Sequence, residues 1–146
     1  DLYNEPHDAG ARDWCYQATL LTDTIRAVHP EALVFVSGLD WGYDLRDVHV
    51  EREHVVYSTH VYRNKTRGLA IQEAFGHRGG EVPLFAGEWG GWDDDLHWGV
   101  DVASYFEELG MGWTAWSWCD DPHLRRGGAV TPFGELVRAW LQRDVG

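Results

Sequence analysis

The sequence predicts an α/β fold in which a parallel sheet is packed against helices that lie outside it. Two observations support this: short, continuous apolar runs recur along the 146 residues, and segments with helical spacing separate them. Continuous apolar runs are typical of strands that are buried on both faces. Strands that alternate with helices favour parallel pairing. No linker, repeat or low-complexity segment divides the chain, so we expect a single domain over residues 1–146.

The beginning of the chain predicts a strand end, a long helix and a complete strand. Residues 1–4 have the composition of the last residues of a strand, and residues 32–38 form an apolar run that ends in glycine. The apolar residues between them step by four and three, which is the spacing of one helix face, and Pro30 ends that helix. This face comprises Trp14, Ala18, Leu21, Ile25 and Val28.

The middle of the chain predicts two further strands. Residues 40–53 are less regular and fit a loop with a short helix, after which residues 54–62 form the second apolar strand. Residues 69–75 predict a helix that Gly76 can end. The run 82–90 is the third strand.

The last part of the chain predicts two helices around a fourth strand. Residues 95–109 have helical spacing, and Gly110 is suited to cap the helix C-terminus. Residues 112–118 form the strand, and Thr131 and Pro132 are the N-cap and first residue of the final helix. Its expected buried face comprises Phe133, Leu136, Val137, Trp140 and Leu141.

Polar and aromatic residues gather where the predicted strands end. They are Asn4, Glu5, Ser37, Asp40, His60, Tyr62, Glu88, Trp116 and Trp118. The C-terminal ends of parallel strands meet at one edge of a sheet, and in (β/α) barrels this edge builds the active site. We therefore expect a functional site at this edge.

Composition narrows the class of ligand. The net charge of −12 argues against nucleic acid or an anionic membrane as partner, because both require basic patches. No apolar run approaches the length of a membrane span. Nine Trp and six Tyr fit either core packing or a carbohydrate groove, in which aromatic faces stack on sugar rings. Cys15 and Cys119 lack metal-site spacing and are interpreted as packing residues.

Two glutamates are the candidate catalytic groups. Glu5 and Glu88 each follow or end a predicted strand, so both can face one cleft. Glycoside hydrolysis needs such a pair, with one carboxyl protonated to donate to the leaving oxygen and the other ionised. The alternative is that both are ordinary surface acids among the 24 acidic residues. The apolar strand before Glu88 and the glycines around it favour catalysis at that position.

Three neighbours fit the same chemistry. Tyr62 can donate a hydrogen bond to an ionised Glu88, and Asn4 can bind a sugar 2-hydroxyl group. His60 can contact sugar or tune a carboxylate. The alternative for His60 and Tyr62 is a structural role in the core.

The motifs YNEP, STHVY, FAGEWGG and WTAWSW, in this order, resemble glycoside hydrolase family 5, the cellulase-like (β/α)8 enzymes. The resemblance implies that Glu5 is the acid/base and Glu88 the nucleophile of a retaining hydrolase, with Asn4 beside them. It places His60 and Tyr62 in the family's His-x-Tyr motif. Among the tryptophans, Trp116 is the expected sugar platform and Trp118 the second choice, while Trp41, Trp89 and Trp92 are expected in neighbouring subsites.

The resemblance covers only part of a barrel. A (β/α)8 domain takes roughly 250 residues, so this chain corresponds to the C-terminal half, from the tip of strand four to helix eight, with about four and a half βα units. Half a barrel leaves unpaired sheet edges and an uncovered inner face. We therefore expect a homo-oligomer or a complementary N-terminal half as partner. We also expect little hydrolysis by the isolated chain, because catalytic groups must be held accurately.

The predicted substrate is a β-linked polysaccharide or oligosaccharide, cleaved as in an endo-β-1,4-glucanase. The alternatives are a β-mannanase or other β-glycanase, and a non-catalytic sugar-binding or self-associating fragment. The mechanism uses carboxylates and water, so no cofactor or metal is expected. The resemblance implies a secreted or extracellular parent enzyme.

Overall fold

The computed structural model describes residues 1–66, 68–120 and 124–143, and it contains a four-stranded sheet. The strands are β1 (Val34–Ser37), β2 (Val55–Tyr62), β3 (Leu84–Gly90) and β4 (Gly112–Ala115). They pair in chain order, β1-β2-β3-β4, and all three pairings are parallel. The predicted α/β class with a parallel sheet is therefore confirmed.

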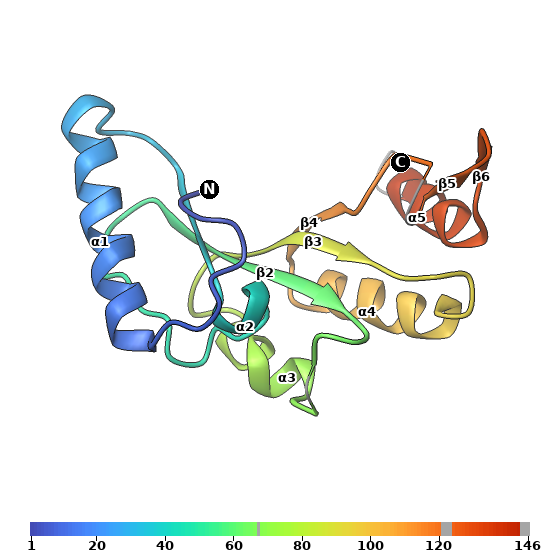
Figure 1. Ribbon diagram of the computed structural model, residues 1–146, viewed down its shortest axis with the longest axis horizontal. Helices are drawn as coiled ribbons and strands as arrows, with labels where there is room; N and C mark the ends of the chain where they lie inside the picture. Colours follow the sequence, from blue (N-terminus) through green and yellow to red (C-terminus); the bar gives the residue numbers. More distant parts are fainter. Residues whose placement is uncertain (67, 121–123, 144–146) are drawn as a thin grey trace.

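Helices connect and flank the strands (Figure 1). They are α1 (Ala11–Val28), α2 (Leu39–Gly42), α3 (Ile71–Ala74), the 3-10 helix η1 (Gly76–Arg78), α4 (Leu96–Glu108) and α5 (Pro132–Arg143). Figure 1 shows α1 beyond one end of the sheet, α5 beyond the other, and α4 alongside β3. No helix in the described ranges has both the length and the apolar composition needed to cross a lipid bilayer.

An aromatic cluster joins the sheet to α4 and α5. The indole of Trp89 is fully buried, and its centroid lies 5.8 Å from that of Phe106 and 5.5 Å from those of Phe133 and Trp113. Gly91 and Gly99 leave room for the ring of Phe133, because a Cβ at either position would lie within 3.0 Å of it. Aromatic rings bury more area than other side chains, so this cluster fixes α4 and α5 against β3.

The ends of the two C-terminal helices match the sequence. Gly110 has φ +64°, the left-handed conformation expected after a helix, and its N–H bonds to the carbonyl oxygen of Glu107. The Thr131 hydroxyl accepts a hydrogen bond from the Gly134 N–H at 3.0 Å, and Pro132 begins α5. The predicted N-cap and the glycine cap are both confirmed.

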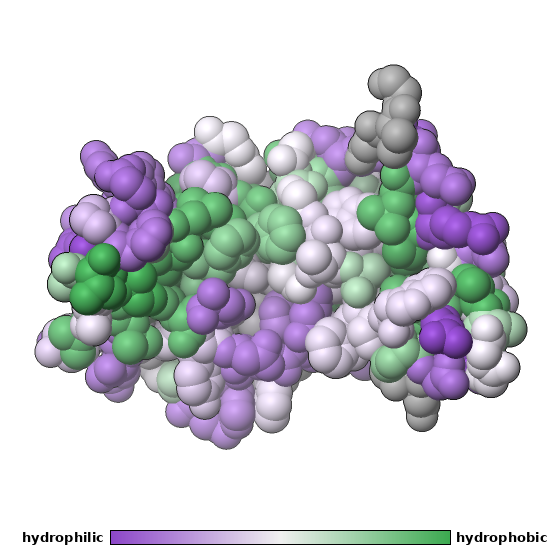
Figure 2. All heavy atoms as spheres, turned by 90° about the horizontal axis from the view of Figure 1, so that it is seen from above, coloured by the Kyte–Doolittle hydropathy of each residue, from purple (hydrophilic) through white to green (hydrophobic). Residues whose placement is uncertain are grey.

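The predicted inner face of α1 is wrong in its second half. Trp14 and Ala18 are buried as expected, together with Thr22, but Val28 is 85% exposed and Leu21 and Ile25 are also exposed. The buried residues are four positions apart, whereas the predicted face alternates between steps of four and steps of three. The two faces therefore diverge after Ala18, and Thr22 is buried where Leu21 was expected. The helix also extends past the edge strand β1, and Figure 2 shows hydrophobic side chains gathered toward this end of the molecule.

Two predicted strands are shorter or absent. Residues 1–4 form no strand, although the Leu2 N–H donates to the Phe35 carbonyl oxygen at 3.1 Å and so places this segment beside β1. The fourth strand ends at Ala115, not at Trp118, and the peptide bond between Trp116 and Ser117 is cis. The predicted 69–75 helix is reduced to α3, and Gly76 begins η1.

A small hairpin was not predicted. Strands β5 (Arg125–Arg126) and β6 (Ala129–Val130) pair antiparallel around Gly127 and Gly128, which have φ +56° and +80°. A two-residue turn with both φ values positive matches the twist of a hairpin and favours glycine. The Gly-Gly pair was therefore a usable signal for this hairpin.

Candidate active site

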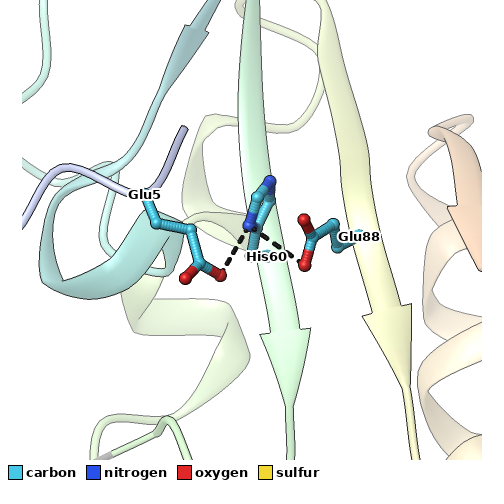
Figure 3. A group of neighbouring side chains, drawn as sticks. All are labelled: Glu5, His60 and Glu88. Carbon is cyan, nitrogen blue, oxygen red and sulfur yellow. Dashed lines mark hydrogen bonds and ion pairs between the residues drawn. The ribbon is translucent and has the colours of Figure 1, made fainter. Parts of the chain in front are cut away.

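The site lies where β2 and β3 end, and an irregularity in their pairing builds it. The register passes from Thr59 opposite Ala86 to His60 opposite Glu88, so Gly87 is an extra residue in β3. Such a bulge re-aims the side chains that follow it. Here it sets the carboxylate of Glu88 next to the imidazole of His60 (Figure 3).

Glu5, His60 and Glu88 form one contact group although they come from three segments. The His60 Nδ1 atom lies 2.8 Å from Oε1 of Glu5 and 3.5 Å from Oε2 of Glu88. One carboxylate oxygen of each glutamate and the His60 nitrogen all lie within 4.8 Å of one another. An ionised carboxylate can accept hydrogen bonds but cannot donate them, so His60 is the donor and carries its proton on Nδ1. The predicted convergence of the two glutamates is therefore present in the geometry.

Two glycines hold the His60 ring in place. His60 is 2% exposed, so its burial fits the predicted role toward the carboxylates and the alternative structural role in the core, and not direct contact with a sugar. A Cβ on Gly42 would lie 2.9 Å from Cγ of His60, and a Cβ on Gly87 would lie 3.1 Å from its Nε2. Real Cβ atoms seldom approach so closely, so the ring fits only because both neighbours lack a side chain.

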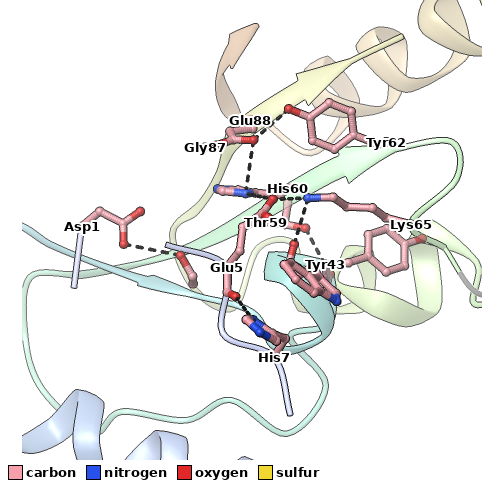
Figure 4. A network of polar contacts seen from close by, with 12 residues as sticks. Asp1, Glu5, His7, Tyr43, Thr59, His60, Tyr62, Lys65, Gly87 and Glu88 are labelled. Carbon is pink, nitrogen blue, oxygen red and sulfur yellow. Dashed lines mark hydrogen bonds and ion pairs between the residues drawn. The ribbon is translucent and has the colours of Figure 1, made fainter. Parts of the chain in front are cut away.

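Glu5 is held by more than its own carboxylate. The Pro6 carbonyl accepts a hydrogen bond from the Trp41 N–H at 3.1 Å, and the His7 ring stacks on the Trp41 ring at 3.9 Å. Glu5 has φ +49°, a left-handed conformation that non-glycine residues seldom adopt and that clusters at functional sites. Figure 4 shows how Glu5 reaches into the polar network from this segment.

Lys65 is a site residue that sequence reasoning missed. Its ammonium donates to Oε1 of Glu5 and lies 4.7 Å from the centre of the Tyr62 ring. Lys65 is on the loop after β2, where a long flexible side chain gives no periodic signal. It is, however, the single lysine of the sequence and follows a strand end, which could have marked it.

Tyr62 acts on the other carboxylate. Its hydroxyl donates to Oε2 of Glu88 at 2.8 Å, the contact expected from the sequence. Burial and then the hydrogen bond to Glu88 raise the pKa of Tyr62 well above its usual value. The phenol therefore stays protonated and remains a donor, which fixes one oxygen of Glu88.

The electrostatics of Glu5 favour its ionised form. Burial alone raises the pKa of Glu5, but the hydrogen bonds from Lys65 and His60 and their positive charge outweigh it, so the pKa lies below the usual value. An ionised Glu5 is not yet a proton donor. The predicted acid role therefore requires a change at Lys65 or at His60.

The glutamates open onto a hollow of about 340 Å³. Its lining residues are Asn4, Glu5, Tyr62, Lys65, Glu88 and Trp116. Trp116 is 45% exposed and lines the hollow, so part of its indole is accessible to a ligand there. Asn4 lines the same hollow beside Glu5, as the sequence predicted.

The other predicted tryptophans do not line this hollow. Trp89 is wrong as a subsite residue, because its side chain is fully buried in the aromatic cluster on the opposite face of β3. Trp118 is 66% exposed and lines a separate apolar hollow of about 460 Å³ next to α5. Trp41 stacks on His7, and Trp92 is 43% exposed beside Asp95.

The Glu5, His60 and Glu88 group is close enough to offer ligands to a metal ion. Each of these groups already has partners in the described residues: Lys65 supplies positive charge to Glu5, and His60 lies between both carboxylates. The hydrogen bonds therefore account for the cluster without an ion. Cys15 and Cys119 are partly buried free thiols, and neither belongs to this group.

Comparison with protein families identifies a match over most of the chain. A family model described as "Cellulase (glycosyl hydrolase family 5)" matches residues 1–122. Among curated proteins, Endoglucanase N of Pectobacterium atrosepticum is 24% identical over 99% of this chain and 35% of its own length. The match includes every residue that lines the glutamate hollow.

Solved structures match the same fold. A β-glucanase from Saccharophagus degradans, solved in complex with cellotetraose, superposes with a TM-score of 0.83 at 20% identity, covering 96% of this chain and 52% of its own. The catalytic domain of the major endoglucanase from Xanthomonas campestris pv. campestris gives 0.79 at 21% identity, over 97% and 55%. The chain therefore spans about half the length of these structures and about a third of the curated relative.

Proposed function

Because the chain belongs to the cellulase family, glycosyl hydrolase family 5, we propose that it carries both catalytic glutamates of a retaining endo-β-1,4-glucanase. The observation that supports this most directly is the pair of carboxylates on one hollow, with oxygens within 4.8 Å of each other. Retaining enzymes hold their carboxyl groups about 5–5.5 Å apart, whereas inverting enzymes need about 6.5–9.5 Å to admit water.

In the proposed reaction Glu88 is the nucleophile. Its ionised carboxylate attacks the anomeric carbon, and the Tyr62 hydroxyl leaves one of its oxygens free to do so. Glu5 donates a proton to the departing glycosidic oxygen. It then removes a proton from the water that releases the sugar from Glu88, so the product keeps its anomeric configuration.

Trp116 and Asn4 would hold the sugar ring. The half-exposed indole offers an apolar face to the sugar C–H groups. Asn4 lies on the same hollow as Glu5, where an amide can bind a hydroxyl group of the reacting sugar. A β-1,4-glucan outside the cell is the substrate that fits this proposal, because the polymer is too large to enter a cell.

Covalent labelling of Glu88 tests the proposal. A 2,4-dinitrophenyl 2-deoxy-2-fluoro-β-cellobioside needs no protonation of its leaving group, so labelling reports on the nucleophile and the sugar site without Glu5 as acid. We expect one sugar adduct per chain by mass spectrometry, located on the peptide that contains Glu88. Glu88→Gln should take no label, while Glu81→Gln, which changes an exposed acid just before β3, should label like the parent chain.

Labelling also distinguishes substrate classes, and failure to label Glu88 would contradict the proposal. Faster labelling by the corresponding manno-configured glycoside would indicate a β-mannanase. An adduct on another carboxylate, or none in a folded chain, would leave the sugar-binding fragment as the better interpretation.

We propose in addition that the open side of the sheet is covered by a second half barrel. Phe35 and Phe85 lie on the inner face of the sheet, with ring centroids 5.3 Å apart, and both are only partly buried. The apolar hollow lined by Trp113, Trp118 and Leu141 lies beyond β4. Light scattering after gel filtration should give twice the chain mass of 16.7 kDa, and a stable monomer would argue for a separate N-terminal half as partner.

A further inference from the structure

Lys65 occupies a position between two hollows. It lines the hollow that contains Glu5 and Glu88, and it also lines a neighbouring hollow of about 370 Å³. In the structure its ammonium is on the glutamate side, bonded to Glu5, and it approaches the Trp41 carbonyl oxygen at 3.4 Å. Its side chain is 25% exposed, so it is partly withdrawn from solvent.

We propose that Lys65 is a positioning residue that keeps Glu5 ionised until a sugar enters the hollow, and that it must move away before Glu5 can act as the acid. The inference rests on the proposed function. It adds a residue that controls when the acid/base group becomes competent, which the two glutamates alone do not explain.

The charges around Glu5 support this assignment. Two donors contact the Glu5 carboxylate. The Lys65 ammonium reaches it from the loop after β2, and the His60 Nδ1 atom on β2 lies 2.8 Å from it. On β3 the nearest ionisable group is Glu88, which shares His60, and its other partner is the hydroxyl of Tyr62. Lys65 is therefore the permanent positive charge in direct contact with Glu5 among the described residues, and its removal favours protonation of that carboxylate.

The neighbouring hollow gives Lys65 a second place to go. Asp40 and Glu73 line that hollow and supply negative charge, with Arg46 3.6 Å from Glu73. Lys65 lines both hollows, and the flexible four-carbon stem of lysine allows its ammonium to turn from one to the other, where it would join Arg46 beside Asp40 and Glu73. A sugar in the glutamate hollow occupies the space on the other side and favours this displacement.

The proton balance of this step is simple. Lys65 remains an ammonium ion in both positions. As it leaves, the Glu5 carboxylate takes up one proton from solvent, and that proton is the one later given to the glycosidic oxygen. No bond to carbon forms or breaks in the step.

Titration of Glu5 by carboxyl-detected NMR tests the inference without any turnover. In Lys65→Met the titration midpoint of Glu5 should shift upward relative to the parent chain, whereas Lys65→Arg, which keeps the charge, should shift it less. Arg52→Met removes the same charge at an exposed site where the partner is Asp23, and should leave the Glu5 midpoint unchanged. Near-ultraviolet circular dichroism checks that each variant is folded.

A second measurement uses the folded parent chain alone. Reductive ¹³C-methylation gives one side-chain signal for Lys65, because the sequence contains no other lysine. That signal should move as Glu5 titrates and should move again when cellobiose is added. A Glu5→Gln chain should lose the first response.

The outcomes separate this inference from the proposed function. A Glu5 midpoint that is the same with Met, Arg or Lys at position 65, or a Lys65 signal that responds to neither pH nor cellobiose, would overturn the inference. An upward shift in Lys65→Met without fluoroglycoside labelling of Glu88 would support the ion-pair control and reject the hydrolase.

Discussion

Replacement of Gly87 by Ala perturbs the bulge on which the site depends. The added methyl group would lie 3.1 Å from Nε2 of His60 and still closer to Oγ of Ser58. His60 and Ser58 are both buried, so neither side chain can move into solvent without opening the sheet. The methyl group must therefore displace the Ser58 hydroxyl, and the His60 ring must also shift by a few tenths of an ångström.

The cost follows from overpacking. Extra methyl groups in a packed interior destabilise by about 1–3 kcal/mol, and the lower unfolded-state entropy of alanine returns about 0.4–1 kcal/mol. The net loss is therefore up to about 2.6 kcal/mol, compared with a stability of about 5–15 kcal/mol for a typical domain. A shift of the His60 ring also weakens its hydrogen bond to Glu5, so the Glu5 titration midpoint should rise.

Urea unfolding followed by tryptophan fluorescence, together with the Glu5 titration, measures both effects. Gly10→Ala is the matched control, because its Cβ would meet nothing closer than 3.9 Å and its φ of −75° suits alanine. We expect the control to change the unfolding free energy by less than about 1 kcal/mol. A Gly87→Ala chain that is as stable as the parent, with an unchanged Glu5 midpoint, would refute the close fit of His60 against the bulge.

Three further outcomes are expected. Trp89→Ala should destabilise the chain by about 3–5 kcal/mol, the usual loss for a buried aromatic side chain, whereas Trp116→Ala should weaken cellobiose binding and leave unfolding by urea nearly unchanged. Because the pKa of Glu5 is lowered on folding, its ionised form stabilises the chain above its unfolded pKa, near 4.5, and this contribution is lost as pH falls through the lower folded pKa. Glu5→Gln should therefore show a smaller loss of stability than the parent chain in acid unfolding, and equal losses would contradict the ion pairs. Tyr62→Phe should slow fluoroglycoside labelling of Glu88 roughly 10-fold or more, since hydrogen bonds to charged groups contribute about 1.5–3 kcal/mol; an unchanged labelling rate would remove the orienting role.

Strands β1, β2 and β3 could be predicted from the sequence because most of their residues are buried. Continuous apolar runs then mark each of these strands directly, and the glycine and proline residues that follow mark the helix ends. Strand β4 has only exposed and partly buried residues, and its predicted extent was too long. The position of Glu88 followed from the same topology, since parallel strands end at one edge. Glu5 lies on a segment that forms no strand and is held beside β1 by the hydrogen bond from Leu2 to Phe35.

Other features depended on contacts that a linear pattern does not encode. Trp89 could have been placed correctly, because side chains alternate along a strand and a residue next to Glu88 faces away from the hollow. The exposure of Leu21, Ile25 and Val28 reflects where α1 leaves the edge of the sheet, which depends on the tertiary arrangement. Lys65 reaches Glu5 across a loop, and no periodicity reports such a contact.

The two glutamates also show how neighbouring groups assign different roles to similar side chains. Both carboxylates lie near the His60 nitrogen, but Glu88 also accepts from a neutral donor, the Tyr62 hydroxyl, whereas Glu5 also meets the Lys65 ammonium ion. In the proposed function, proton supply by Glu5 is therefore the controlled step, and Glu88 is held ready for nucleophilic attack.

The anomeric form of the first product tests the carboxylate pair most directly. Hydrolysis of 2,4-dinitrophenyl β-cellobioside, followed by ¹H NMR from the first minutes, distinguishes the two stereochemical courses before the sugar equilibrates. Carboxylate oxygens within 4.8 Å predict that β-cellobiose is released first. Initial release of α-cellobiose would contradict a double displacement at Glu5 and Glu88.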